Sequence, residues 1–175
     1  MKKHVIFSII ALLAAGCCSS NRMSAVDNAK EMIQRNRAEC VIVKNEKIAA
    51  VERGRGVNPL LKLYDEHREI MQNAVIVDKV IGRAAAFIAI KGNVAEVYGK
   101  IMSEDAVSLL TAHKIRYSYG LLVPRILNRN RDALCPLEAS VVNINEPELA
   151  LKSLRKKIAE LRRGNFRAET KPRSK

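Results

Sequence analysis

Two short runs of β-forming residues, separated only by Asn45-Glu46, constrain the fold of this chain more than any other feature. The first run is Cys40-Val41-Ile42-Val43 and the second is Lys47-Ile48-Ala49-Ala50-Val51. Asparagine tolerates the left-handed backbone that a two-residue turn requires, so the spacing predicts a β-hairpin. Apolar residues at helical spacing over 25–36 predict a helix before it.

After the hairpin, segments with helical periodicity alternate with single apolar runs. Asn58-Pro59 is expected to cap one helix, and a second is expected to begin at Asp78 after a short strand over 74–77. Ser103, followed by two acids, predicts a third helix start. The other predicted elements are strands over 94–102 and 115–119, a polar loop over 126–134, a short helix opened by Cys135-Pro136 and a last helix opened by Pro147. This alternation predicts an α/β protein with a layered sheet.

The net charge of +13 is concentrated at the two ends of the chain. Residues 1–22 carry +3 and residues 152–175 carry +8, which leaves +2 for residues 23–151. Aromatic residues make up only 4% of the chain and Trp is absent, so few side chains can stack on nucleic-acid bases. No specific nucleic-acid partner is therefore expected for the folded part.

The first 22 residues have the plan of a secretory leader. A basic start at Lys2-Lys3 precedes an apolar run over 5–15 and small residues before Cys17. The run is shorter than the roughly 20 residues that span a bilayer. The ending resembles a bacterial lipobox, which implies an exported protein held at the membrane only by a lipid on Cys17. The alternative is a cytoplasmic protein whose translation starts at Met23.

Residues 162–175 are rich in Lys and Arg and show no apolar periodicity. This composition is typical of a solvated, disordered tail, so the folded domain is expected over residues 23–161. Such a tail binds phosphate-rich partners only weakly and in a salt-dependent way.

Three blocks resemble an uncharacterised bacterial family, a domain of unknown function that shares the cytidine-deaminase fold without its zinc ligands. The blocks are RGVNPLL at 55–61, DKVIGRAAA at 78–86, and a third that joins Leu122-Val123-Pro124 to Asn128-Arg129 and to CPLE at 135–138. The resemblance covers residues 25–154 at matching spacing. It implies one α/β domain with a cytidine-deaminase-like layered sheet, helices and an opening β-hairpin.

Zinc deaminases of that fold carry His or Cys with a following Glu at one helix start and two cysteines at the next. The resemblance places Asp78-Lys79 and Ser103-Glu104 at those starts. Neither pair supplies the three protein ligands that a catalytic zinc requires. Zinc-dependent deamination is therefore not expected, and no metal or other cofactor is predicted.

Cys135 is the most specific candidate for chemistry. Pro136 suits a first helical position, which makes Cys135 the predicted N-cap, and Glu138 follows at the spacing of a capping box. A thiol there would face free N–H groups, which favour the reactive thiolate. One hypothesis makes Cys135 a nucleophile, and the alternative makes it a buried cap. Cys40 lies in an apolar strand and is expected to be structural.

Other polar residues complete the predicted pocket. Asp78 and Glu104 are candidates for acid–base chemistry and Lys79 for binding an anion, but the alternative is that they are ordinary helix caps and a solvated lysine. Arg55 lies in a basic loop with two glycines that suits a phosphate. The remaining predicted ligand-binding residues are Ser103, Asn128 and Arg129.

These features predict a zinc-independent pocket for a nucleoside-like, nucleotide-like or other phosphate-bearing small molecule, with Cys135 as the nucleophile if the protein is an enzyme. The alternative is a non-catalytic domain that binds a ligand or a protein partner, held at a membrane if the leader is genuine. Both hypotheses stay open at this point, because a shared fold does not determine function.

Overall fold

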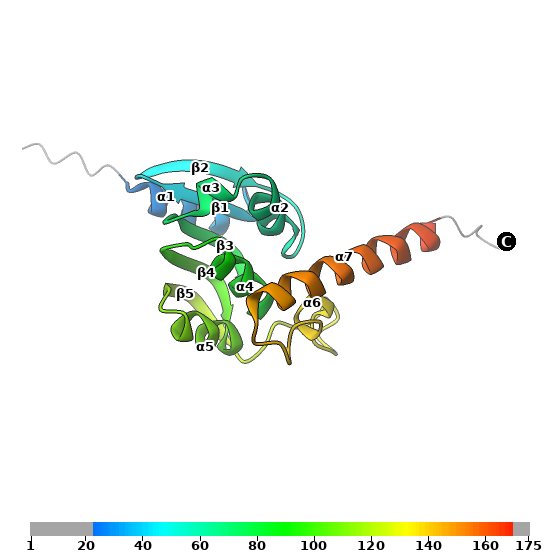
Figure 1. Cartoon of the computed structure of the whole chain (residues 1–175). Helices are drawn as coiled ribbons and strands as arrows, with labels where there is room; N and C mark the ends of the chain where they lie inside the picture. Colours follow the sequence, from blue (N-terminus) through cyan, green and yellow to red (C-terminus); the bar gives the residue numbers. More distant parts are fainter. Residues whose placement is uncertain (1–22, 170–175) are drawn as a thin grey trace, which may run out of the picture.

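A mixed five-stranded sheet in the order β2-β1-β3-β4-β5 forms the centre of the computed structural model, which describes residues 23–169, with side chains up to Arg163 (Figure 1). The strand β1 (Cys40–Lys44) pairs antiparallel with both β2 (Lys47–Glu52) and β3 (Val75–Ile81). The strands β4 (Glu96–Ser103) and β5 (Arg116–Val123) continue the sheet parallel to β3. The predicted α/β class and layered sheet are confirmed. The leader with Cys17 lies outside the described residues, as do residues 170–175.

The opening hairpin forms at the predicted turn. Asn45 and Glu46 have φ angles of 50° and 58°, so both turn residues adopt the left-handed backbone. β1 is buried along most of its length, whereas β2 at the sheet edge alternates between exposed and half-buried residues. The hairpin therefore supplies one central strand and one edge strand.

Helices cover the two faces of the sheet unequally. On one face lies α1 (Ala25–Gln34), whose N-cap Ser24 accepts a hydrogen bond from the backbone N–H of Asp27. The opposite face carries the larger core and all the other helices (Figure 1). These are α2 (Asn58–Glu66), α3 (Arg68–Met71), α4 (Arg83–Lys91), α5 (Glu104–Ala112), α6 (Pro136–Ala139) and α7 (Pro147–Glu169).

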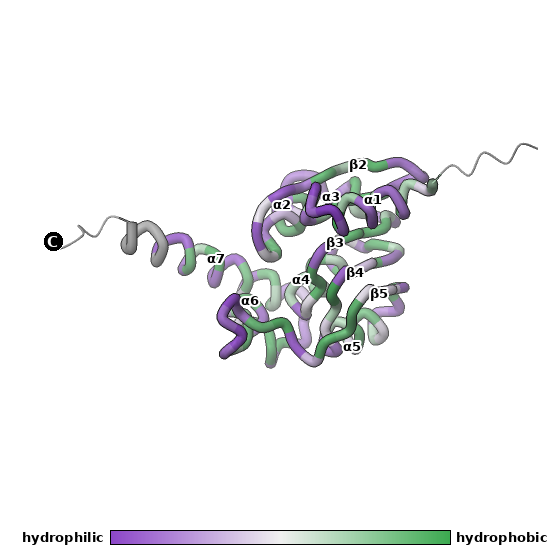
Figure 2. Tube along the Cα trace, turned by 180° about the vertical axis from the view of Figure 1, so that it is seen from behind, coloured by the Kyte–Doolittle hydropathy of each residue, from purple (hydrophilic) through white to green (hydrophobic). Residues whose placement is uncertain are grey.

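The larger core is aliphatic and centres on α4. Residues 84–89 of that helix are all buried, and α4 contacts α2, α5, α6 and α7 as well as the sheet. The helix α7 is amphipathic: Figure 2 shows hydrophobic and hydrophilic residues alternating along it, and Ala150, Leu151, Leu154 and Ile158 are its buried positions. None of the helices in the described part of the chain combines the length and apolarity that crossing a membrane requires.

The prediction that a helix begins at Asp78 is wrong. β3 continues to Ile81, with Asp78 beside Cys40 on one neighbouring strand and Gly99 on the other, and α4 begins only at Arg83. A strand buried on both faces reads as a nearly continuous apolar run without alternation. Val80 and Ile81 therefore fit either pattern in the sequence, and pairing across the sheet decides between them.

The predicted cap at Asn58 is also wrong. Val57 is the N-cap of α2 and makes no side-chain cap hydrogen bond, while Asn58 is the first helical residue. The amide Nδ2 of Asn58 instead donates to the backbone carbonyl of Arg55, 3.2 Å away. Asn58 thus tightens the loop before α2.

The tail predicted to be disordered from residue 162 begins as helix, because α7 extends to Glu169. Residues 158–163 (IAELRR) are strong helix formers, and they extend a helix that packing of its first half has already formed.

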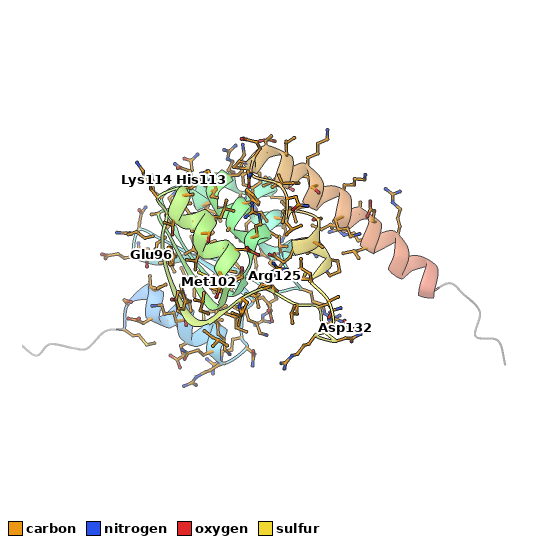
Figure 3. All side chains as sticks on the ribbon, turned by 90° about the horizontal axis from the view of Figure 1, so that it is seen from below. Glu96, Met102, His113, Lys114, Arg125 and Asp132 are labelled. Carbon is orange, nitrogen blue, oxygen red and sulfur yellow. The ribbon has the colours of Figure 1, made fainter. Side chains whose placement is uncertain are left out.

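The parallel strands direct their carboxyl ends to one edge of the sheet. In Figure 3, Glu96, His113 and Lys114 mark the amino edge, and Arg125 and Asp132 belong to the loop that leaves the carboxyl edge after β5. Ligands of open α/β sheets bind outside the carboxyl ends of the strands. The candidate site lies at this edge.

Candidate functional site

Two adjoining cavities lie at the carboxyl edge and share Gly56, Cys135 and Leu137 in their walls. The larger, which we call the outer cavity, has a volume of about 610 Å³ and is bounded by the loop before α2, the loop after β5 and the second half of α7. The smaller, which we call the inner recess, has about 80 Å³ and reaches Asp78 and Lys79 on β3. The sequence-predicted residues thus fall into two chemically different compartments.

Three arginines give the outer cavity its charge. Arg55, Arg129 and Arg162 come from the loop before α2, the loop after β5 and α7, respectively. Within residues 23–163 none of them forms an ion pair, and no Asp or Glu lines this cavity. The lining of the outer cavity therefore gives these guanidinium groups no carboxylate counter-charge, although Arg162 also borders a neighbouring cavity that Glu52, Asp65 and Glu66 line.

Amide side chains add neutral polar groups to the same wall. Asn58, Asn128 and Asn130 line the outer cavity. Asn128 donates through Nδ2 to Asp132 Oδ1 at 2.7 Å, whereas its buried Oδ1 has no hydrogen-bond partner. A buried acceptor without a partner is costly, so this oxygen is an unsatisfied polar group next to the cavity.

Asp78 lies in the wall of the inner recess with only 9% of its surface exposed. Its Oδ1 accepts the backbone N–H of Val80 at 2.9 Å. Burial raises the pKa of Asp78 to about 7, against the opposing effect of the hydrogen bonds that it accepts. Its neighbour across the sheet, Cys40, is fully buried, and burial together with the charge of Asp78 raises the pKa of the Cys40 thiol well above its usual value.

Lys79 reaches the recess already paired. Its Nζ lies 3.0 Å from Glu39 Oε1, and each side chain is about one-third exposed. The positive charge predicted to bind an anion is therefore balanced by a neighbouring carboxylate.

Glu138 holds the short helix α6 against the start of α4. Its carboxylate accepts the backbone N–H of Arg83 at 2.8 Å and that of Ala84 at 3.1 Å. Only 8% of the residue is exposed, and this burial raises the pKa of the Glu138 carboxyl group. The carboxylate thus caps α4 from a distance of more than fifty residues in sequence. The predicted capping box between Cys135 and Glu138 is wrong for this reason.

Arg83, in the first turn of α4, donates hydrogen bonds back to the segment that follows α6. Its guanidinium donates to the carbonyls of Val141 and Ile144 at 3.1 and 2.6 Å, and to Asn145 Oδ1 at 3.0 Å. The first turn of α4 therefore binds both α6 and the segment that follows it. This attachment fixes the wall that carries Cys135.

Cys135 is half-buried at the junction of the two compartments. It is the N-cap of α6, but its thiol makes no cap hydrogen bond, and its backbone N–H donates to the carbonyl of Ile126 at 3.0 Å. No histidine lines either compartment in the described part of the chain. Cys135 therefore lines both compartments, and no base among the described residues is hydrogen-bonded to its thiol.

Ser103 and Glu104 do not join this site. Ser103 is fully buried and its Oγ accepts the backbone N–H of Ala106 at 3.2 Å, so it is the N-cap of α5. Glu104 is exposed in the first turn of the same helix. Neither residue lines the outer cavity or the inner recess.

The structure brings together most of the predicted set and adds residues that the sequence analysis missed. The outer cavity contains Arg55, Asn128, Arg129 and Cys135, and the recess contains Asp78 and Lys79. The missed residues are Glu39, Asn58, Arg162 and Glu138. For Glu138 the sequence does contain a local signal: Gly82, which has no side chain, allows the Glu138 carboxylate to approach the backbone there.

No three His, Cys, Asp or Glu side chains gather into a possible metal site in the part of the chain that the structure describes. The chain does contain one His-x-Glu spacing, at His67-Arg68-Glu69. These residues lie at the junction of α2 and α3, with the His67 and Glu69 side chains largely exposed, and not at the starts of α4 or α5.

Together these features define a small α/β domain with a two-compartment pocket at the carboxyl edge of its sheet. Residues 28–158 match the family described as a domain of unknown function, DUF1893, and the chain belongs to this family. The predicted membership in an uncharacterised family is confirmed.

One structural comparison agrees with this assignment. A crystal structure of a DUF1893 family protein (TM1506) from Thermotoga maritima matches with a TM-score of 0.66 and 19% identity, over 78% of this chain and 89% of that one. At this identity the likeness shows a shared fold. Two structures of Acinetobacter baumannii RibD, forms 2 and 1, match with TM-scores of 0.38 and 0.40 and identities of 18% and 17%. Those matches cover 53% and 55% of this chain and about a third of RibD. No curated protein matches the sequence.

Proposed function

We propose that the protein binds a phosphate-bearing small molecule of nucleotide size in the outer cavity, without zinc. The observation that carries this proposal is the set of three arginines, Arg55, Arg129 and Arg162, which meet at one cavity whose described lining residues include no carboxylate. Guanidinium groups donate in pairs to phosphate oxygens, and such charge-assisted hydrogen bonds are about twice as strong as neutral ones.

The rest of the outer cavity suits an organic group attached to the phosphate. Its volume of about 610 Å³ falls in the ordinary range for small-molecule sites. Leu127, in the loop after β5, and Leu161, on α7, both line the cavity and are 47% and 38% exposed. Burial of these side chains beneath a ligand would remove apolar surface from water.

In the enzymatic form of this proposal, Cys135 is the nucleophile and Asp78 the acid–base group. Cys135 lines both compartments, and Asp78, with a pKa of about 7, is able to exchange a proton near neutral pH. In the alternative form, the domain binds its ligand without changing it. Lipid attachment at Cys17 would place either form at a membrane surface.

Isothermal titration with AMP tests the proposal. Arg129→Ala and Arg55→Ala should each weaken binding by at least about tenfold, because each removes a charge-assisted contact. Arg35→Ala is the matched control, since Arg35 pairs with Glu31 on α1, against the opposite face of the sheet. Failure of AMP, ADP and inorganic phosphate alike to bind, or an equal loss in the control, would contradict the proposal.

A further inference from the structure

We infer that the ligand of the outer cavity is a diphosphate ester and that arginines hold its diphosphate without a bridging metal ion. This inference rests on the proposed function and specifies its substrate class.

The charge of the outer cavity favours a diphosphate over a monophosphate. Three guanidinium groups face it from three separate elements, and neither its lining nor an ion pair among the described residues offsets them. A phosphate monoester has a charge of about −2 at neutral pH and balances roughly two of them. A diphosphate ester adds about one further negative charge and more acceptor oxygens, so it matches all three arginines.

The positions of the carboxylates near the cavity argue against a bridging metal ion. A divalent cation on a diphosphate is ordinarily held by one or two protein carboxylates. Among the described carboxylates close to the cavity, Glu39 is paired with Lys79 in the inner recess, and Glu138 there accepts from the backbone of α4. Asp132, beside the outer cavity, accepts from the amide of Asn128. None of the described carboxylates lines the outer cavity itself, so guanidinium groups take the place of the metal.

The two compartments give the ligand a direction. The inner recess, at about 80 Å³ and lined by Asp78, is too small and too acidic for phosphate. The diphosphate therefore lies among the arginines, and an uncharged polar group of the ester points toward the recess past Cys135. Among the described side chains that line the outer cavity none is aromatic, so leucines and guanidinium planes contact the organic group.

Titration calorimetry with a ladder of probes in EDTA tests the inference. The probes are inorganic phosphate, pyrophosphate, AMP, ADP, ATP and isopentenyl diphosphate. ADP should bind at least about tenfold more tightly than AMP, and ATP within about threefold of ADP. Excess Mg²⁺ should weaken ADP binding, because the cation competes with the arginines. ADP and isopentenyl diphosphate distinguish a nucleoside from an aliphatic ester, and tight binding of either one supports the inference.

Arg162→Gln provides the second measurement, with its neighbour Arg163→Gln, which does not line the cavity, as the matched control. Loss of one charge should weaken ADP binding by at least about tenfold, whereas Arg163→Gln should change it by less than about threefold. Equal affinities of the parent protein for AMP and ADP, or tighter binding with Mg²⁺, would overturn the diphosphate inference while leaving the proposed function intact. If no probe binds, both fail.

Discussion

The carboxylate of Glu138 occupies the space that a side chain at Gly82 would need. A Cβ placed on Gly82 would lie 2.6 Å from the carboxylate carbon of Glu138 and 2.7 Å from Oε2. From this position the carboxylate accepts two backbone N–H groups at the start of α4. The absence of a side chain at residue 82 therefore allows α6, and Cys135 with it, to dock against the start of α4.

Gly82→Ala should lower the free energy of unfolding by about 1–3 kcal/mol, because the new methyl group forces the buried carboxylate away from its donors. Glu138→Ala should cost about 1–3 kcal/mol, because it leaves two N–H groups of α4 without a partner. Chemical denaturation measures both. In the Glu138→Ala background, Gly82→Ala should cost much less, since the clash is gone. Strictly additive losses in the double variant would show that the two residues do not act on each other.

Arg83→Lys should destabilise the protein even though it keeps the positive charge. The guanidinium of Arg83 donates to two carbonyls and to Asn145, and a single ammonium group cannot reproduce this geometry. We expect a loss of about 1–3 kcal/mol in denaturant unfolding, with faster hydrogen exchange over residues 141–145. Arg68→Lys is the control, because Arg68 makes one such hydrogen bond, to the carbonyl of Lys91. An equal effect in both variants would contradict the role assigned to Arg83.

Asp78 should make the protein less stable as the pH rises. Its pKa is raised to about 7 in the folded chain, against roughly 3.9 in an unfolded one. Between these values the folded state binds the extra proton, so the contribution of Asp78 to stability is highest below about pH 4 and falls by about 1.4 kcal/mol per unit until about pH 7. Asp78→Asn should remove this slope and stabilise the protein above pH 7.

Urea unfolding at a series of pH values measures the slope. Asp27→Asn serves as control, because Asp27 is exposed in the first turn of α1. A slope between pH 4 and 7 that is the same in the parent and in Asp78→Asn would show that Asp78 is ionised in the folded protein.

Local patterns predicted the elements whose formation is local. The hairpin follows from Asn45-Glu46, and the start of α5 follows from Ser103, whose hydroxyl caps that helix. The start of α4 did not follow, because residues 78–81 are held in β3 by pairing with β1 and β4. Strand pairing of this kind joins residues far apart in sequence, and periodicity alone cannot distinguish a buried strand from a helix.

The site was predictable in its residue types but not in its arrangement. Arg55, Asn128, Arg129 and Cys135 were expected in one pocket, and they line one cavity. Arg162 was missed because it was assigned to a disordered tail, while α7 carries it to the cavity wall. Glu138 was assigned to its own helix, yet it caps another helix. Both errors concern contacts between elements, which the sequence does not display.

Selective alkylation of Cys135 tests the placement of the pocket and the nucleophile hypothesis together. Cys40 is fully buried with a raised thiol pKa, whereas Cys135 is half-buried on both compartments, so native protein should take up one adduct, on Cys135. Intact-mass measurement on a Cys17→Ser, Cys18→Ser background counts the adducts, and Cys135→Ser should abolish them until denaturant exposes Cys40. Saturating ADP should slow the reaction, because the ligand covers the shared wall. If Cys135 also reacts faster than a model thiol at neutral pH, the enzymatic form of the proposal is favoured. An ordinary rate favours the form in which the domain binds its ligand without changing it. Labelling of Cys40 at the rate of Cys135 in native protein would contradict the placement of Cys135 in an accessible pocket and of Cys40 in the core.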